Sequence, residues 1–298
     1  MTTPNSASLN FASLGSQVKR LEIKTRRMLS ADLLGGFRTA FRGSGLVYSD
    51  LRDYQPGDEV RNIHWKASAR SQRIYVKSYE EDRRVNILLV IDVSASTSFG
   101  APRSKHLKAL EFSALVSALA LKNGDKLGLC LFADGVQEFI SPKASRVHFH
   151  KVLYHLNNPQ VLKRVSDLDA ALAQLRKLEL RQSIVFIVSD FICPPFEENL
   201  RLLNIKHDCI CVMLEDDLDY ELPQAGLVEL EDCEAQTRIV VDTSSARGKQ
   251  LFQALHSRHL ERTAELCRRH RVDFVRLREK PVQALIDLMR ARTRRGVR

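Results

Sequence analysis

The 298-residue sequence lacks the features that mark several common kinds of protein. No apolar run approaches the roughly 18–20 residues that a membrane-spanning helix needs. The first ten residues do not show the charged-then-apolar pattern of a secretory signal. The six cysteines include no Cys-x-x-Cys pair, which argues against a zinc site. We therefore expect a cytoplasmic protein with reduced thiols and no membrane span.

Signatures of common enzymes are also missing. There is no Gly-x-x-x-x-Gly-Lys loop for nucleotide phosphates and no His-Glu-x-x-His pattern for a metalloprotease. An aspartyl phosphatase would need a second Asp two residues after Asp92, where Ser94 stands. His256 and His259 lie one helical turn apart near Glu261, and we interpret them as a solvated helix face. The sequence therefore predicts a protein that is not an enzyme.

Charge is distributed unevenly along the chain. The net charge of +10 divides into +6 for residues 1–84, −4 for residues 85–257 and +8 for residues 258–298. Basic ends suit nucleic acid, an acidic partner or a membrane surface, and they also occur as solvated helix faces, which we favour. A nucleic-acid-associated basic α/β protein is therefore the alternative function, although we expect nucleic acid to be the weaker candidate partner.

What the sequence does contain is a regular alternation of short apolar runs with amphipathic segments. We predict strands at residues 87–91, 127–132, 183–188, 208–214 and 274–277, and helices at 104–121, 147–156, 168–178, 196–203, 245–270 and 282–292. A turn at Asp134-Gly135 leads to a strand at 136–140, and residues 228–230 and 238–241 suit a hairpin. This order predicts an α/β fold with a doubly wound, mainly parallel sheet of the Rossmann-like kind.

A small subdomain is expected before this sheet. Residues 14–34 have helical periodicity that Gly35-Gly36 would stop, and Pro56-Gly57 signals a turn before a short strand at 73–79. The predicted organisation is a disordered segment at 1–13, an N-terminal helix with a hairpin-rich subdomain at 14–84, a main domain at 85–280, and a basic C-terminal helix and tail at 281–298.

The strand at 87–91 runs directly into Asp92, Ser94 and Ser96. Because alternate residues of an extended chain point to the same side, one carboxylate and two hydroxyls converge where the strand leaves the sheet. Ligands of open α/β sheets bind at this edge, and such oxygen donors suit Mg²⁺. The alternative is that these residues only form a turn and cap the next helix.

Two later segments suit the same site. Ser166 precedes an apolar helical pattern as its expected N-cap, and the strand at 183–188 ends in Ser189-Asp190. If the two strands are neighbours, Ser166 and Asp190 approach Asp92.

These residues resemble the metal-ion-dependent adhesion site of the von Willebrand factor type A family. The resemblance implies a von Willebrand A-like domain with Mg²⁺ as cofactor, or Mn²⁺ or Ca²⁺ in its place. Ser94 and Ser96 would bind the metal directly, and Asp92 and Asp190 mostly through water. One position would stay open for a partner's carboxylate. Ser166 stands where the family has Thr, with Asp167 as the alternative; the implied ligands are Asp92, Ser94, Ser96, Ser166 and Asp190.

A second resemblance lies at residues 51–70, which read Leu-Arg-Asp-Tyr-Gln-Pro-Gly-Asp-Glu-Val-Arg-Asn-Ile-His-Trp-Lys-Ala-Ser-Ala-Arg. They are similar to the signature of an uncharacterised bacterial family, domain of unknown function 58, whose members carry it before a von Willebrand A-like domain. Members are typically encoded beside MoxR-type AAA+ ATPases. The resemblance implies such an ATPase as partner, other von Willebrand A proteins as further partners, and a chaperone-like role in maturing a protein complex.

The signature has two interpretations. In the structural one, Pro56-Gly57 forms a turn, Asp58 pairs with Arg61, and Trp65 is an anchor packed on the main domain. In the functional one, the segment is a docking surface for the ATPase. The residues of that surface would be Arg61, Trp65, Lys66 and Arg70.

Overall fold

The structure is a computed structural model that describes residues 29–41, 45–71, 73–82, 84–98, 104–157, 165–220, 226–231, 238–242, 245–278 and 280–295. The chain divides into two compact units, one of residues Phe41–Val85 and one of Met1–Ala40 with Asn86–Arg298. The disordered segment predicted at 1–13 and most of the helix predicted at 14–34 lie outside the described residues.

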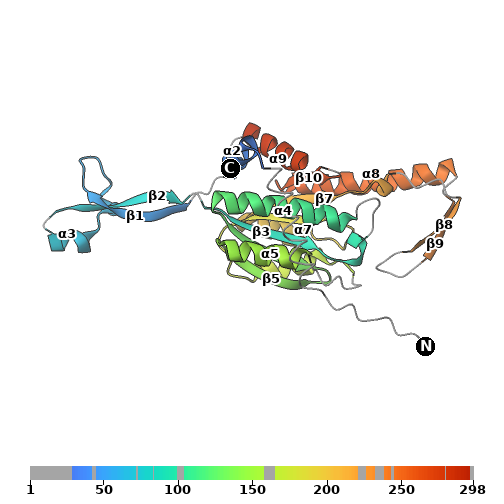
Figure 1. The fold of residues 1–298 in the computed structure, drawn as a ribbon, viewed down its shortest axis with the longest axis horizontal. Helices are drawn as coiled ribbons and strands as arrows, with labels where there is room; N and C mark the ends of the chain where they lie inside the picture. Colours follow the sequence, from blue (N-terminus) through green and yellow to red (C-terminus); the bar gives the residue numbers. More distant parts are fainter. Residues whose placement is uncertain are drawn as a thin grey trace, which may run out of the picture. The chain divides into compact units, whose positions relative to one another are not determined.

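The larger unit is built on a six-stranded sheet in the order β10-β7-β6-β3-β4-β5 (Figure 1). Every neighbouring pair is parallel except β4 with β5. The prediction of an α/β fold with a mainly parallel sheet is confirmed. The strands are β3 (Asn86–Asp92), β4 (Lys126–Phe132), β5 (Val136–Lys143), β6 (Ile184–Ser189), β7 (Asp208–Leu214) and β10 (Asp273–Leu277).

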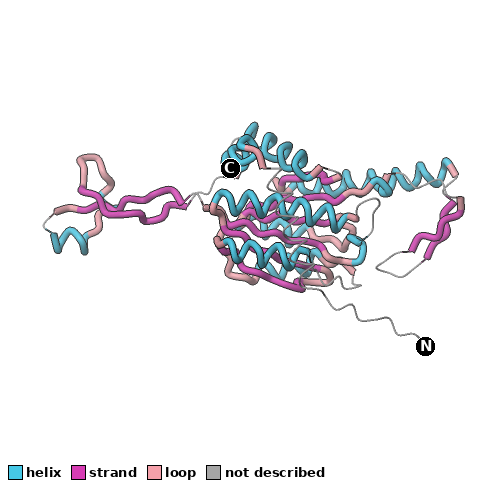
Figure 2. The backbone as a smooth tube through the Cα atoms, viewed as in Figure 1, coloured by secondary structure: helices cyan, strands magenta, loops and turns pink. Residues whose placement is uncertain are grey.

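Helices cover both faces of this sheet (Figure 2). On one face, Leu88 and Val90 of β3 join an apolar core with residues of three helices, α6 (Leu168–Arg176), α7 (Glu197–Lys206) and α8 (Ala246–Arg269). On the other face, Phe112 of α4 (Lys105–Asn123) meets the ring of Phe186 at 5.9 Å. Fully burying such side chains contributes about 1.5–3 kcal/mol each. The unbroken apolar runs of the central strands follow from this two-sided burial.

Three further α-helices lie in the described part of the larger unit: α2 (Ala31–Ala40), α5 (Arg146–Asn157) and α9 (Pro281–Arg295). We expected Gly35-Gly36 to stop the first of these, and that prediction is wrong, because α2 runs through both glycines. Leu33 and Phe37 are almost fully buried, and α2 packs against α9 and α4. Tertiary packing of this apolar face offsets the low helix propensity of glycine.

Residues suited to capping stand at both ends of α4. Ser104 accepts a hydrogen bond from the backbone N–H of Leu107 at the N-terminus, and Gly124 ends the helix with a φ of 75°. That left-handed conformation favours glycine, since a side chain there is strained. The cap at Ser104 determines where the first turn of α4 begins, and this turn contains Lys105, which lies beside the candidate site described below.

The smaller unit is a hairpin, as predicted. Its strands β1 (Gly45–Asp53) and β2 (Tyr75–Asp82) are antiparallel, and η1 (Val60–Asn62) and α3 (Trp65–Ser71) lie between them in the chain. We expected α2 to belong with this hairpin, whereas it groups with the sheet.

Two expectations for residues 51–70 are wrong. Asp58 pairs with Arg52, at 2.6 Å between Oδ1 and Nη2, and Arg61 pairs instead with Glu59 at 2.7 Å. The side chain expected to be a packed anchor, Trp65, is 63% exposed. The turn at Pro56-Gly57 is present, with Gly57 at a φ of 108°.

A second hairpin confirms another prediction. Strands β8 (Leu227–Glu231) and β9 (Arg238–Asp242) pair antiparallel, and η3 (Asp217–Asp219) precedes them. Within the described ranges, no helix combines the length and apolar character needed to span a bilayer.

Candidate functional site

Asp92 and Asp190 lie at the carboxyl ends of two neighbouring parallel strands. Ile91 of β3 pairs with Val188 of β6, so Asp92 lies opposite Ser189 and Asp190 follows one residue later. Neighbouring strands are about 4.7–4.9 Å apart. The next strand along the chain, β4, pairs with one edge of β3, and the later strand β6 pairs with its other edge. The two acids therefore lie at the switch point of the sheet, where open α/β folds bind ligands.

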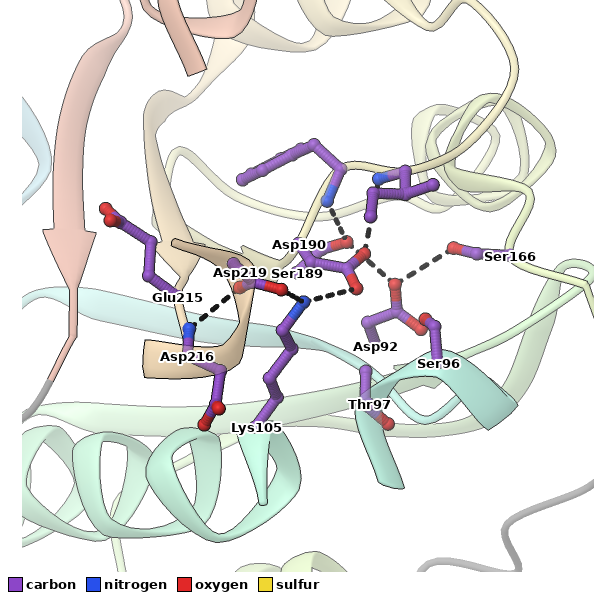
Figure 3. A network of polar contacts seen from close by, with 12 residues as sticks. Asp92, Ser96, Thr97, Lys105, Ser166, Ser189, Asp190, Glu215, Asp216 and Asp219 are labelled. Atoms are coloured by element: carbon purple, nitrogen blue, oxygen red, sulfur yellow. Dashed lines mark hydrogen bonds and ion pairs between the residues drawn. The ribbon is translucent and has the colours of Figure 1, made fainter. Parts of the chain in front are cut away.

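Asp92 is buried; the hydroxyls of Ser166 and Ser189 hold it (Figure 3), and so does a backbone amide. Its Oδ1 accepts from the N–H of Ser94 at 2.9 Å, and its Oδ2 accepts from Ser166 Oγ at 2.9 Å and Ser189 Oγ at 2.7 Å. Burial, with the charge of Asp190 adding to it, raises the pKa of Asp92 to about 6, although the hydrogen bonds from Ser94 and Ser189 lower it. A positive charge at this position would stabilise the ionised carboxylate.

Asp190 is held by the loop that follows it and by side chains of α4 and α8. Its Oδ1 accepts from the N–H of Ile192 at 3.2 Å, and its Oδ2 lies 3.4 Å from Nζ of Lys105, which also lies 3.2 Å from Oδ1 of Asp219. Nε2 of His259 in α8 lies 2.9 Å from the Asp190 carbonyl oxygen. Burial alone would lower the pKa of Lys105, but the two acids raise it above its ordinary value.

The backbone after Asp190 has an unusual conformation. Phe191 has a φ of 56°, a region that costs a non-glycine residue about 1–3 kcal/mol. Its N–H donates to Ser189 Oγ at 2.9 Å, and its buried ring stacks on Phe196 at 5.6 Å between centroids. These contacts fix Ser189, which in turn fixes Asp92.

The five residues named as ligands come from three segments that meet at this edge of the sheet. Ser94 Oγ and Ser96 Oγ lie 3.1 Å apart, and Ser166 contacts Asp92. We expected Ser166 to be the N-cap of α6, and that prediction is wrong. Asp167 has that role, since it accepts from the N–H of Ala170, which commits one of its carboxylate oxygens to the helix.

The donors fit a hard divalent cation by their chemistry. They comprise two carboxylates and three hydroxyls, all oxygen. The hydrogen bonds that hold Asp92 in the described part of the chain bring no full positive charge. Across the same ranges, no three His, Cys, Asp or Glu side chains converge as a metal cluster, so a cation here would depend on serine oxygens and water.

Two lysines of α4 hold an acidic segment beyond β7, and one of them, Lys105, links this segment to the site; the sequence did not reveal this connection. Lys108 Nζ lies 2.8 Å from the Glu215 carbonyl oxygen and 2.9 Å from Asp216 Oδ2. The carboxylate of Glu215 pairs with Arg276 at 2.6 Å. Lysines in a helix usually indicate a solvated face, but Lys105 and Lys108 are both buried.

His256 and His259 do not form a solvated face, contrary to our interpretation. His259 contacts the Asp190 carbonyl oxygen, and the His256 ring lies edge-on to Tyr220 at 4.5 Å. Helix α8 thus contributes to the surroundings of the site.

The four residues named for partner docking lie apart from these ligands in the sequence, in the smaller unit. Arg61, Trp65, Lys66 and Arg70 are all exposed. Two other large apolar side chains of this unit are also exposed, Val60 at 62% and Ile74 at 48%.

A family model described as "Protein of unknown function DUF58" matches residues 50–262. Uncharacterized protein Rv1480 of Mycobacterium tuberculosis is 31% identical over 226 residues, covering 74% of this chain and 71% of that protein. Uncharacterized protein YeaD of Bacillus subtilis is 29% identical over 193 residues, covering 62% and 44%. A solved structure of an aerotolerance-related membrane protein from Bacteroides fragilis aligns with a TM-score of 0.43 and 14% identity, over 71% of this chain and 100% of that one.

Proposed function

Since the chain belongs to the DUF58 family of proteins of unknown function, we propose that it is a metal-dependent protein-binding module. In this proposal its sheet unit is a von Willebrand A-like domain that holds Mg²⁺. The module works with a MoxR-type AAA+ ATPase in chaperoning or maturing a protein complex, and it performs no catalysis of its own.

One observation carries the proposal: two carboxylates and three serine hydroxyls meet at the switch point of a parallel sheet. Asp92 and Asp190 supply the charge, and Ser94, Ser96 and Ser166 supply neutral oxygens. A bound divalent cation would supply a coordination position for a carboxylate of the partner.

The chain's own residues keep this site in place. Ser189 and the N–H of Ser94 hold the two oxygens of Asp92, so the carboxylate cannot rotate freely. The amide of Ile192 fixes one oxygen of Asp190. Such preorganisation lowers the cost of ordering the ligands when a cation and a partner bind.

The ATPase enters the proposal through the signature at residues 51–70. In the smaller unit, Trp65 and Val60 are exposed, and so are the basic residues Lys66 and Arg70. Aromatic and arginine side chains are enriched in the centres of protein interfaces. This combination supports docking of a partner that has an acidic surface with an apolar patch.

The test is a pull-down of the MoxR-type ATPase from the same organism. We expect the wild-type chain to retain it with Mg²⁺ and to release it with EDTA, and Asp92→Asn to fail in both conditions. Ser113→Ala, a buried substitution in α4 away from the candidate ligands, is the matched control and should behave as wild type. Equal retention with Mg²⁺ and EDTA would contradict the metal-dependent mechanism.

The alternative, nucleic-acid association, has less support. Arg292 of the basic C-terminal helix pairs with Asp208 at 2.6 Å and with Asp273 at 2.7 Å, so this arginine is committed to the fold. Arg290 and Arg294 are exposed. Binding to nucleic acid would weaken steeply with salt, and the double variant Arg290→Ala/Arg294→Ala would weaken it further.

A further inference from the structure

Lys105 places a buried positive charge inside the candidate metal site. The residue is 4% exposed, and its ammonium lies between Oδ2 of Asp190 and Oδ1 of Asp219, at 3.4 and 3.2 Å (Figure 3). It is the first residue of α4, where the helix dipole disfavours a cation. Burial also disfavours an ammonium unless acids surround it. Without its two acidic partners, a charged lysine would therefore be unfavourable at this position.

The neighbouring lysine provides a comparison. Lys108, one turn along α4, is also buried, but its partners are Glu215 and Asp216, and neither is a candidate ligand. Lys105 alone of these two contacts a candidate ligand. A role in anchoring α4 accounts for Lys108, whereas Lys105 also neutralises a carboxylate that a metal would need.

We propose that Lys105 is a resident cation that competes with the divalent metal for Asp190 and thereby sets the metal affinity of the site. The inference rests on the proposed function and adds its regulation. When a metal binds, the ammonium leaves Asp190 and stays with Asp219 alone. The ammonium then remains close to the metal, and its positive charge opposes metal binding.

A count of formal charges gives the direction in which Lys105 changes metal affinity. Asp92, Asp190 and Asp219 contribute three negative charges and Lys105 one positive charge. The net charge before metal binding is therefore −2, and a bound divalent cation makes it zero. Without Lys105 the net charge would be −3, so the group would attract the cation more strongly. Removing a unit charge a few ångströms from the metal should tighten metal binding by at least about tenfold, because the repulsion between like charges at the effective dielectric of a protein surface exceeds the free energy of a tenfold change.

The first experiment measures Mg²⁺ binding to the full chain by isothermal titration calorimetry. We expect Lys105→Met to bind Mg²⁺ at least about tenfold more tightly than wild type, and Lys105→Arg, which keeps the charge, to stay near wild type. Lys122→Met makes the same charge change at the exposed far end of α4 and should leave the affinity unchanged. Equal affinity of wild type and Lys105→Met would overturn the inference while leaving the proposed function standing. Failure of every variant to bind would overturn both.

The second experiment needs no substitution. Acetylation of lysines in the wild-type chain, followed by mass spectrometry, reports how accessible each ammonium is. We expect Lys105 to react slowly without metal and several times faster with saturating Mg²⁺, whereas Lys108 should not change. A Lys105 rate that Mg²⁺ does not alter would overturn the competition between ammonium and metal.

Discussion

At the scale of single residues, the site depends on serine hydroxyls that hold a buried carboxylate. Ser189 is the residue that the implied ligand set did not include, although it donates the shortest of the hydrogen bonds reported for Asp92, at 2.7 Å. It also accepts from the N–H of Phe191. Loss of the Ser189 hydroxyl would remove one hydrogen-bond partner from the Asp92 carboxylate and one from the N–H of Phe191, and both groups are buried.

We expect Ser189→Ala to lower the free energy of unfolding by about 1–3 kcal/mol, because it leaves a buried N–H and part of a carboxylate unsatisfied. Ser113→Ala is the matched control. Ser113 is also buried, but among the described groups its hydroxyl has no hydrogen-bond partner, so its removal should be neutral or stabilising. Urea unfolding of the two variants measures both effects, and equal losses would contradict this account of Asp92.

His207 provides a pH-dependent prediction. It is 5% exposed, and burial lowers its pKa to about 4 from 6.5, with Lys206 adding to the effect. The unfolded chain takes up a proton as the pH falls below 6.5, while the folded chain does not until about pH 4. The free energy of unfolding therefore decreases with falling pH across this window, by up to about 3 kcal/mol from this group.

The measurement is urea unfolding at pH 7.5 and pH 4.5 for wild type and His207→Gln. We expect wild type to lose about 2–3 kcal/mol more than the variant between the two pH values. The comparison cancels the contribution of the other acid-sensitive groups. Equal losses would show that His207 does not set the acid limit of the fold.

At the scale of elements, sequence periodicity predicted nearly every described strand and helix of the sheet unit, because burial on one or both faces imposes a pattern on the residues. The same reasoning placed Asp92 and Asp190 at one edge, since parallel strands bring their carboxyl ends together. It failed where tertiary contacts decide. Phe37 and Leu33 carry α2 past two glycines, and Asp167 rather than Ser166 caps α6.

The partners of Lys105 and His259 were not predictable for a related reason. Both residues lie on helices whose periodicity identifies a face but not the strand loop that the face meets. Lys105 reaches Asp190 across 85 positions of the sequence, and His259 reaches it across 69. Only the packing of α4 and α8 on the sheet determines these contacts.

Helix α9 gives the prediction for this scale. The guanidinium of Arg292 is largely buried and joins Asp208 and Asp273, which begin β7 and β10. We expect Arg292→Ala to lower the free energy of unfolding by about 2–4 kcal/mol, since it leaves two acids without this partner. Exposed Arg290→Ala should change it by less than about 0.5 kcal/mol. Denaturant unfolding distinguishes the two, and similar values would mean that α9 is not held by this ion pair.

At the scale of the whole molecule, the candidate metal site and the exposed basic-apolar surface belong to different units of the chain. Residues Phe41–Val85 contain Trp65, Lys66 and Arg70, and the other unit contains both site aspartates. The two roles in the proposal are therefore separable by substitution, one for metal binding and one for partner docking.

We expect Trp65→Ala to weaken retention of the ATPase at least tenfold while leaving Mg²⁺ affinity and the free energy of unfolding within error of wild type. The side chain is 63% exposed, so its loss creates no cavity in the fold. Pull-down, titration calorimetry and urea unfolding on one preparation test the three parts. Unchanged retention would remove Trp65 from the docking surface, and marked destabilisation would favour a structural role.

The central claim is that Asp92 and Asp190 together hold one divalent cation. The most direct measurement is Mn²⁺ binding followed by electron paramagnetic resonance, in which free Mn²⁺ gives a sharp signal that is lost when the ion binds. We predict one Mn²⁺ per chain for wild type, displaced by Mg²⁺, and loss of that site in both Asp92→Asn and Asp190→Asn, with Ser113→Ala unaffected. Wild type without a bound Mn²⁺, or full binding retained in either aspartate variant, would contradict the account.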